Sequence, residues 1–293
     1  CFPVVVKPVD KSGNRGMSYC SNKEELIKAY KYARSVSENS AIIVERQLHG
    51  SEFAVNYVLA DGEINLHFFS SEHNQPGELE NLYSLIITTS EYLKQYLEEV
   101  NNKVIEVFKK AGCREGVAWV ECIRDEDGHF YLLEMGYRYG GEVINIPYQK
   151  VCGFDSIEWM IDIALGKKHK KQDLPQALDN AYIGCAAAYM LFATEDGCIA
   201  SIEGLEELSK IPNVYLDMPK RVGANVHYHA TMGVVRIAAD DCNTLCETIE
   251  KINTKLKIKN EKGENMFIYF DDFTTIKKEY LNGIKEFELN INS

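Results

Sequence analysis

Two glutamates, Glu121 and Glu134, have a spacing that predicts a cation site. The segment 116–135 reads as two strands rich in branched and aromatic residues, joined by an acidic turn that ends in Asp127-Gly128. Asp-Gly is a strong signal for a two-residue hairpin loop, and a loop at these residues places Glu121 directly opposite Glu134. Directly opposed side chains have Cβ atoms about 4.5–5.5 Å apart, where two carboxylates repel each other unless a proton or cation lies between them. Hard oxygen ligands of this kind suit Mg²⁺, with phosphate completing its coordination.

A guanidinium accompanies the two acids. Arg138 follows four residues after Glu134, on the same predicted face. The alternative interpretation is a solvated hairpin face on which acids gather by chance. The register also depends on the loop, because a three-residue loop would shift the pairing and separate the two glutamates.

A candidate phosphate-binding segment lies near the start of the chain. Lys7 ends an apolar strand, and the loop that follows contains Ser12, Gly13 and Gly16. Glycines and small polar residues let backbone N–H groups approach phosphate oxygens, while the lysine supplies a positive point charge. The loop lacks the Gly-x4-Gly-Lys-Ser/Thr pattern of a Walker loop. A flexible turn of the same composition is the alternative.

A third candidate follows the next predicted strand. Glu45, Arg46 and Leu48 lie at its end, and Glu52 comes shortly after. An acid, the backbone and an apolar side chain at a strand end can read an adenine edge, and a following acid can accept ribose hydroxyl groups. An ordinary charged loop is the alternative.

Strands and helices predicted from the apolar patterns must position these candidates. Ser21 and Glu24 form a capping-box pattern, which predicts the start of the first helix. The basic stretch 166–171 reads as a boundary before a smaller C-terminal α+β unit. The predicted strands are 2–8, 41–46, 52–60, 63–70, 182–193, 226–229 and 233–238, and the predicted helices are 23–37, 90–111, 156–165, 242–256 and 275–287.

The composition favours small-molecule chemistry. The 293 residues are 45% hydrophobic and 26% charged, which is ordinary for a globular protein with a substantial core. A formal net charge of −12 argues against nucleic acid or an anionic membrane as the main partner. Nine cysteines without a Cys-x-x-Cys pair indicate reduced thiols. With neither a signal peptide nor a membrane span in the sequence, the chain is expected to be cytoplasmic.

The three candidates in this order resemble the ATP-grasp superfamily. The resemblance is carried by the segments 2–17, 42–55 and 116–142 and covers roughly the first 170 residues. It implies an α+β fold in which two α+β subdomains grip ATP, with a small C-terminal α+β domain added. The expected boundaries are 1–48 for a partial small (lid) subdomain, 49–171 for the large subdomain with the metal site, and 172–293 for the C-terminal domain.

The resemblance also implies roles for individual residues. Lys7 would contact the ATP phosphates, and the loop with Ser12, Gly13 and Gly16 would fold over them. The residues implied to hold adenine are Glu45, Arg46 and Leu48, with Glu52 on the ribose. Glu121 and Glu134 match the family's two acidic ligands for Mg²⁺, which Mn²⁺ can replace. Arg138, before Gly140-Gly141, matches the arginine that meets the acyl phosphate or the carboxylate substrate.

Three departures from the family pattern stand out. Gly136 occupies the position of the asparagine that is usually a third metal ligand. The basic residue expected near the γ-phosphate has only His67 and His73 as candidates, and we favour His73. The chain also begins almost at Lys7, without the preceding domain of the family, so we expect it to be a C-terminal fragment that is inactive alone.

The resemblance predicts an ATP- and Mg²⁺-dependent carboxylate–amine ligase that acts through an acyl phosphate. Its partners would be small-molecule carboxylates and amines, with no nucleic acid and no membrane, and a homodimer is a reasonable oligomer. One alternative is a carboxylase or an enzyme like carbamoyl-phosphate synthase, which phosphorylates bicarbonate. The other, favoured by Gly136, is an ATP-binding protein that has lost catalysis.

Overall fold

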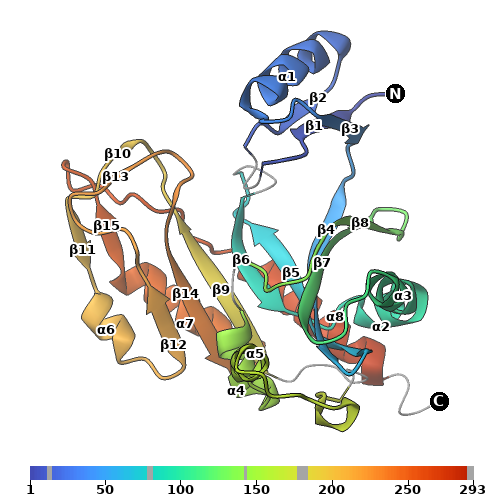
Figure 1. The fold of residues 1–293 in the computed structure, drawn as a ribbon. Coiled ribbons are helices and arrows are strands. Elements are labelled where there is room, and N and C mark those ends of the chain that lie inside the picture. The colour runs from blue at the N-terminus through green and yellow to red at the C-terminus, as the bar shows by residue number, and fades with distance from the viewer. Residues whose placement is uncertain (12–14, 78–81, 142–143, 177–183, 289–293) are drawn as a thin grey trace. The chain divides into compact units, whose positions relative to one another are not determined.

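The chain divides into two compact units, one made of residues 1–50 with 125–129 and the other of residues 51–124 with 130–293 (Figure 1). The computed structural model describes residues 1–11, 15–77, 82–141, 144–176 and 184–288. In these residues no helix is both long enough and apolar enough to cross a membrane.

The first unit is a three-stranded antiparallel sheet with one helix. Its elements are β1 (Val4–Pro8), β2 (Ser18–Cys20), α1 (Lys23–Val36) and β3 (Ile42–Arg46), in the sheet order β2-β1-β3. Small residues on α1, Ala29 and Ala33, pack on Val6 in a buried cluster. The predicted strands and helix are therefore confirmed, while Ser12 and Gly13 lie outside the described residues.

The cap of α1 lies one residue later than predicted. The Asn22 side chain accepts the N–H of Glu25 at 2.9 Å, and the Glu25 carboxylate accepts the N–H of Ser21 at 2.7 Å. The Asn22 oxygen thereby satisfies an N–H group that the first helical turn leaves free, and the Glu25 carboxylate binds the N–H that precedes the cap. The predicted pair Ser21 and Glu24 was wrong by one position, because asparagine caps as well as serine does.

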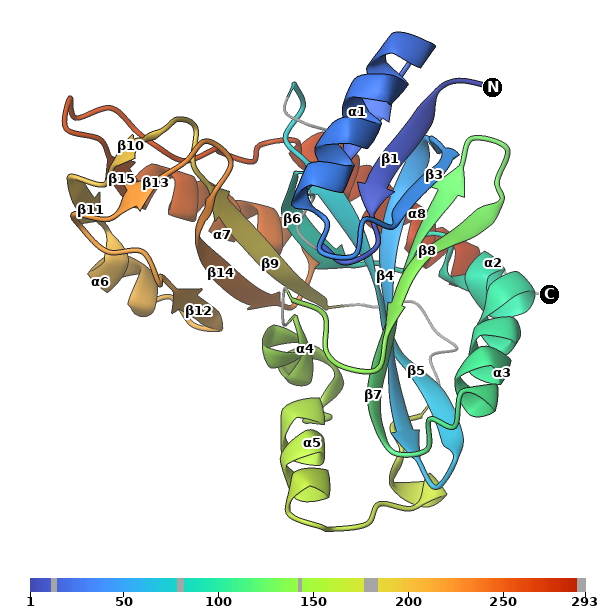
Figure 2. The same ribbon diagram turned by 45° about the horizontal axis from the view of Figure 1, so that its top comes forward.

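The second unit is built on one eight-stranded sheet in the order β12-β14-β9-β6-β5-β4-β7-β8 (Figure 2). Strands from both sides of residue 171, the predicted boundary, belong to this sheet. Two pairs of short strands, β10 (Gly197–Cys198) with β13 (Asn225–Val226) and β11 (Ser201–Glu203) with β15 (Lys257–Lys259), lie outside it. The sheet strands are β4 (Gly50–Ala60), β5 (Glu63–Asn74), β6 (Tyr83–Thr88), β7 (Gly116–Asp125), β8 (Phe130–Gly136), β9 (Cys185–Phe192), β12 (Val214–Asp217) and β14 (Thr231–Ala239).

Helices cover the sheet of the second unit. The single helix predicted over 90–111 is interrupted by a π-helical turn at Leu97–Asn101, and a short 3₁₀ turn occurs at Lys171–Asp173. The helices predicted over 242–256 and 275–287 are confirmed within two residues at each end. The helices are α2 (Leu93–Tyr96), α3 (Asn102–Lys110), α4 (Asn145–Cys152), α5 (Ser156–Ala164), α6 (Leu205–Ser209), α7 (Cys242–Lys255) and α8 (Phe273–Glu288).

Strand alternation separates the apolar cores from the face that carries the candidate site. On β7, Val120 and Cys122 are fully buried in the core that includes Leu93 of α2 and Val104 of α3. Successive side chains on a strand point to opposite faces of the sheet. Glu121, between two core residues, therefore points away from α2 and α3.

Candidate functional site

The β7–β8 hairpin pairs the two predicted acids. Glu121 lies opposite Glu134 in the register, which confirms the predicted pairing. The predicted reason was wrong, because the loop has three residues: Asp125 N–H donates to the His129 carbonyl at 3.0 Å and closes the turn there. A β-bulge between Glu121 and Cys122 then restores the register, since Cys122 pairs with Leu132 and Glu121 with Glu134. The bulge compensates for the longer loop.

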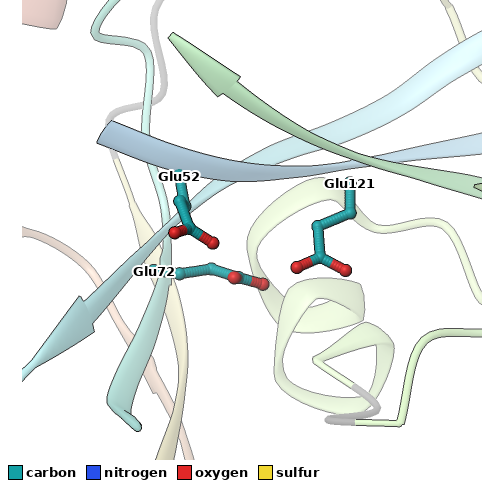
Figure 3. A group of neighbouring side chains, drawn as sticks. All are labelled: Glu52, Glu72 and Glu121. Atoms are coloured by element: carbon teal, nitrogen blue, oxygen red, sulfur yellow. The ribbon is translucent and has the colours of Figure 1, made fainter. Parts of the chain in front are cut away.

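Three carboxylates converge on one face of the sheet. Glu52 of β4, Glu72 of β5 and Glu121 of β7 each offer an oxygen, and these oxygens all lie within 4.8 Å of one another (Figure 3). All three side chains are half-buried, where charge is poorly screened. We call this group the acidic cluster. It gathers negative charge at one point, an arrangement that favours binding of a hard cation.

A tyrosine borders the acidic cluster. The Tyr83 hydroxyl donates a hydrogen bond to the Glu52 carboxylate. Burial raises the pKa of Tyr83, and the negative charges of Glu52 and Glu72 raise it further. The hydroxyl therefore remains protonated and serves as a fixed donor to the cluster.

The sequence did not single out Glu72. Ala60 pairs with Glu63 across the Asp61-Gly62 turn, and an unbroken register from there would place Ser71 opposite Glu52. A register shift between Asn56 and Tyr57 instead places Glu72 opposite Glu52. The turn is visible in the sequence, but the shift is not, so the pattern alone gave no signal for this third acid.

Glu134 and Arg138 lie at the exposed end of the hairpin. The Glu134 side chain is 60% exposed, and its carboxylate lies 3.9 Å from the Arg138 guanidinium. Arg138 also donates to the Tyr139 carbonyl at 2.6 Å. The structure thus places Glu134 beside Arg138, and its role as a metal ligand stays a prediction.

Trp119 lies against Gly136, the position where the family resemblance places a third metal ligand. Trp119 pairs with Gly136 in the hairpin. A Cβ atom added at Gly136 would lie 2.4 Å from Trp119 Nε1, closer than real Cβ contacts allow. An asparagine at this position is therefore incompatible with the indole as it stands, which explains the glycine.

In the first unit, two of the predicted ATP contacts bind each other. Lys7 of β1 forms an ion pair with Glu45 of β3, and both side chains are partly exposed. Arg46 ends β3 and is exposed, and Leu48 follows it half-buried. A lysine held by a carboxylate must exchange that partner to meet a phosphate.

Gly16 has a structural reason to be glycine. Its φ is +83°, and an added Cβ would lie 2.5 Å from Val36 Cγ2. Both the left-handed backbone and the close approach of α1 exclude other residues there. The glycine is therefore explained without reference to phosphate binding.

The two candidate histidines of β5 have different surroundings. His67 is 4% exposed and packs against Phe68, Tyr148 and Phe154. Burial lowers the pKa of His67 to about 3, so it is neutral and cannot serve as a phosphate-binding cation. His73 Nε2 lies 3.2 Å from the Glu279 carboxylate of α8. His73, the favoured candidate, is thus tied to the C-terminal helix.

A comparison with known proteins identifies this architecture. A family model described as the ATP-grasp domain matches residues 1–146. A D-alanine--D-alanine ligase from Psychrobacter sp. is 28% identical over 143 residues, which cover 46% of this chain and 41% of the ligase. The chain therefore spans less than half the length of this relative.

Two solved structures share the fold. An L-amino acid ligase from Bacillus licheniformis superposes with a TM-score of 0.74 at 21% identity, covering 89% of this chain and 64% of the ligase. The biotin carboxylase domain of the Hydrogenobacter thermophilus 2-oxoglutarate carboxylase, a dimer solved with MgADP, ADP and bicarbonate, gives 0.65 at 17% identity, with coverages of 89% and 58%. These likenesses confirm the predicted fold.

Proposed function

Because the chain belongs to the ATP-grasp superfamily, we propose that it acts as an ATP- and Mg²⁺-dependent carboxylate–amine ligase through an acyl phosphate. The observation that carries the proposal is the acidic cluster, in which three carboxylates offer oxygens within 4.8 Å of one another. Such a group is unfavourable until a cation neutralises it. The solved neighbour that holds MgADP supports Mg²⁺ with a nucleotide as the occupant.

The proposal assigns roles to the acids around the cluster. Glu121 and Glu134 keep their predicted role as metal ligands, and Glu72 joins them. Glu52, which the sequence assigned to ribose, moves to the metal group because it lies with Glu72 and Glu121. Mg²⁺, when bound, neutralises charge on the β- and γ-phosphates of ATP.

The proposed reaction has two steps. An oxygen of the substrate carboxylate attacks the γ-phosphorus, the bond to the β,γ-bridging oxygen breaks, and ADP leaves. The amine nitrogen then attacks the carbonyl carbon of the acyl phosphate, loses a proton, and inorganic phosphate leaves. Arg138, 59% exposed at the hairpin end, supplies positive charge to an anionic oxygen. No protein nucleophile is needed.

Residues of the first unit are proposed to bind the nucleotide. Lys7 meets the phosphates after it exchanges Glu45 for them, and Glu45, Arg46 and Leu48 hold adenine. Ser12, Gly13 and Gly16 belong to the proposed phosphate loop. His73, on β5 of the second unit, is the proposed γ-phosphate contact. Each of these assignments rests on the family resemblance.

ADP release tests the proposal. The complete protein is incubated with ATP and Mg²⁺ and with pools of amino acids, other small carboxylic acids and amines. Stimulation that requires both an acid and an amine supports the ligase, and mass spectrometry then identifies the joined product. Absence of stimulation by every pair, with ATP still bound, would contradict the ligase and favour an ATP-binding protein without catalysis.

A bicarbonate-phosphorylating enzyme is the second candidate. The observation in its favour is the likeness to a carboxylase domain solved with bicarbonate. Stimulation of ADP release by bicarbonate without any organic acid would select it. The same neighbour is a dimer, so we also propose a homodimer, which light scattering of the complete protein tests.

A further inference from the structure

The C-terminal helix α8 contacts β5 on both sides of Glu72. The Ser71 hydroxyl lies 2.7 Å from His73 Nε2, and His73 Nε2 lies 3.2 Å from the Glu279 carboxylate of α8. The Ser71 hydroxyl also donates to the same Glu279 oxygen at 3.4 Å. Ser71 is 3% exposed, and the side chains of His73 and Glu279 are 12% and 19% exposed. One carboxylate thus holds the two residues that flank a member of the acidic cluster.

These three residues of β5 alternate between the two faces of the sheet. Ser71, Glu72 and His73 pair with β6 without a register shift, so successive side chains point to opposite faces. Glu72 points to the face of the acidic cluster, while Ser71 and His73 point to the other face, where they meet Glu279. Glu279 can therefore act on the metal group only through the position of Glu72.

The pairing of β5 changes register on either side of this segment. β4 and β5 shift between Asn56 and Tyr57, and the pairing of β5 with β6 shifts directly after His73. A slip of one residue moves every side chain of a strand to the other face. Such a slip would turn Glu72 toward Glu279, where two carboxylates at a partly buried position repel each other. The hydroxyl and imidazole there now can both donate, so Glu279 favours the register that presents Glu72 to the acidic cluster.

Close packing of α8 fixes where Glu279 lies. Gly283 follows Glu279 by one helical turn, so the two residues share a face of the helix. A Cβ atom at Gly283 would lie 2.4 Å from Ser90 Oγ and 2.6 Å from the Glu91 backbone nitrogen. Asn282 Nδ2 also donates to the Glu91 carboxylate at 2.9 Å. The backbone of α8 therefore lies directly against the segment before α2, which gives Glu279 a defined position beside β5.

We propose that Glu279 is a positioning residue for the metal group, because it fixes the register of β5 and so presents Glu72 to the bound cation. This role rests on the proposed function, in which Glu72 binds Mg²⁺. Glu279 acts from the opposite face of the sheet and contacts neither the metal nor the substrate. For His73, the contact with Glu279 takes the place of the γ-phosphate contact that the family resemblance implies.

Titration calorimetry of the complete protein with Mg²⁺ and the non-hydrolysable ATP analogue AMP-PNP tests this role. Glu279→Ala removes the contacts with Ser71 and His73. We expect it to raise the dissociation constant of Mg²⁺ by about tenfold, as is common for residues that hold metal ligands in place. Glu279→Gln should restore most of the affinity, because its carbonyl oxygen can still accept from both donors. A dissociation constant in Glu279→Ala equal to that of the parent would overturn the positioning role.

Asn282→Ala is the matched control, because it removes a hydrogen bond between α8 and Glu91 instead of a contact with β5. We expect it to lower the melting temperature and to leave the Mg²⁺ dissociation constant unchanged. An equal rise of that constant in Asn282→Ala and Glu279→Ala would show that any loosening of α8 weakens the site. That result would also overturn the specific role of Glu279.

Amide hydrogen exchange distinguishes this role from the proposed function, because it needs no ligand. If Glu279 fixes the register, the β5 amides around Glu72 should exchange several-fold faster in Glu279→Ala than in the parent or in Asn282→Ala. Unchanged exchange would overturn the role of Glu279 even where Mg²⁺ binding falls. If the parent binds no Mg²⁺ with AMP-PNP, the proposed function fails, while faster exchange in Glu279→Ala would still support a register fixed by Glu279.

Discussion

The two hairpins that carry the acidic cluster reach the same face of the sheet by different local routes. In β4–β5, Asp61 and Gly62 both have positive φ, as a tight two-residue turn of the mirror-image type requires. In β7–β8, the loop has three residues, and Gly128 is the one with positive φ. Each hairpin then shifts register once, and each shift decides which acid stands opposite another. A turn therefore fixes the register only as far as the first bulge.

Substituting single acids is the strongest test of whether both hairpins contribute to one cation site. If both hairpins serve one cation, Glu72→Gln in β5 and Glu121→Gln in β7 should each lower Mg²⁺-dependent ADP release by about 100-fold or more. Glu106→Gln, on the solvent side of α3, is the control and should have no effect. A normal rate in Glu72→Gln would remove Glu72 from the metal group.

Glu134→Ala tests whether the exposed Glu134 binds the metal together with the three half-buried acids of the acidic cluster. We expect it to abolish Mg²⁺-dependent turnover and to leave the melting temperature near that of the parent, because the side chain is 60% exposed. Unchanged turnover would remove Glu134 from the metal group and leave the acidic cluster as the site.

Restoring the family's asparagine tests the packing that is special to β7–β8. Gly136→Asn should lower the free energy of unfolding by about 1–3 kcal/mol, because its Cβ would overlap the Trp119 indole. The double variant with Trp119→Ala should lose less than the sum of the two single changes, as measured by chemical denaturation. Additive losses would show that the two side chains do not compete for space.

Tyr83→Phe tests how much the hydroxyl group on β6 contributes to metal binding by the acids of β4 and β5. Loss of the hydroxyl bond to Glu52 should weaken Mg²⁺ binding by about tenfold, because the carboxylate loses the donor that orients it. Isothermal titration with Mg²⁺ and AMP-PNP measures the change. Tyr280→Phe, on α8, is the control.

The smallest effects should come from the turns themselves. Gly62→Ala and Gly128→Ala each force a side chain into a left-handed backbone, with φ of +81° and +88° in the parent. Each should lower the free energy of unfolding by about 1 kcal/mol in a denaturant titration. A larger loss of activity in one variant would show that its turn also sets the register of its acids.

The sequence predicted the elements of these hairpins better than their registers. Apolar alternation and Asp-Gly turns located both hairpins, and the pairing of Glu121 with Glu134 was predicted correctly although the loop was not. Glu72 was missed because the register shift between Asn56 and Tyr57, which brings it opposite Glu52, left no signal in the residue pattern. Tertiary packing likewise sets the charge of His67, since burial among aromatic rings lowers its pKa to about 3 and keeps it neutral.

Contacts between residues far apart in the sequence could not be predicted from the motifs. Lys7 and Glu45 were predicted separately as nucleotide contacts, and the β1–β3 register brings them together. Gly136 was interpreted from the sequence as the loss of a metal ligand. Only the structure shows that a side chain at this position would overlap the Trp119 indole. Residue types indicated what chemistry these residues could perform, but only the structure showed which residues contact one another across the strands.

The contact between β5 and α8 bears on the order in which the protein is assembled during synthesis. Ser71 precedes Glu72 of the acidic cluster on β5. The Ser71 hydroxyl donates a hydrogen bond of 3.4 Å to the Glu279 carboxylate of α8, 208 residues away in the sequence. Translation makes α8 after every strand of the sheet. Contacts between distant segments form late because the intervening chain must first be ordered. A nascent chain therefore carries the acids of β4, β5 and β7 long before α8 can contact β5.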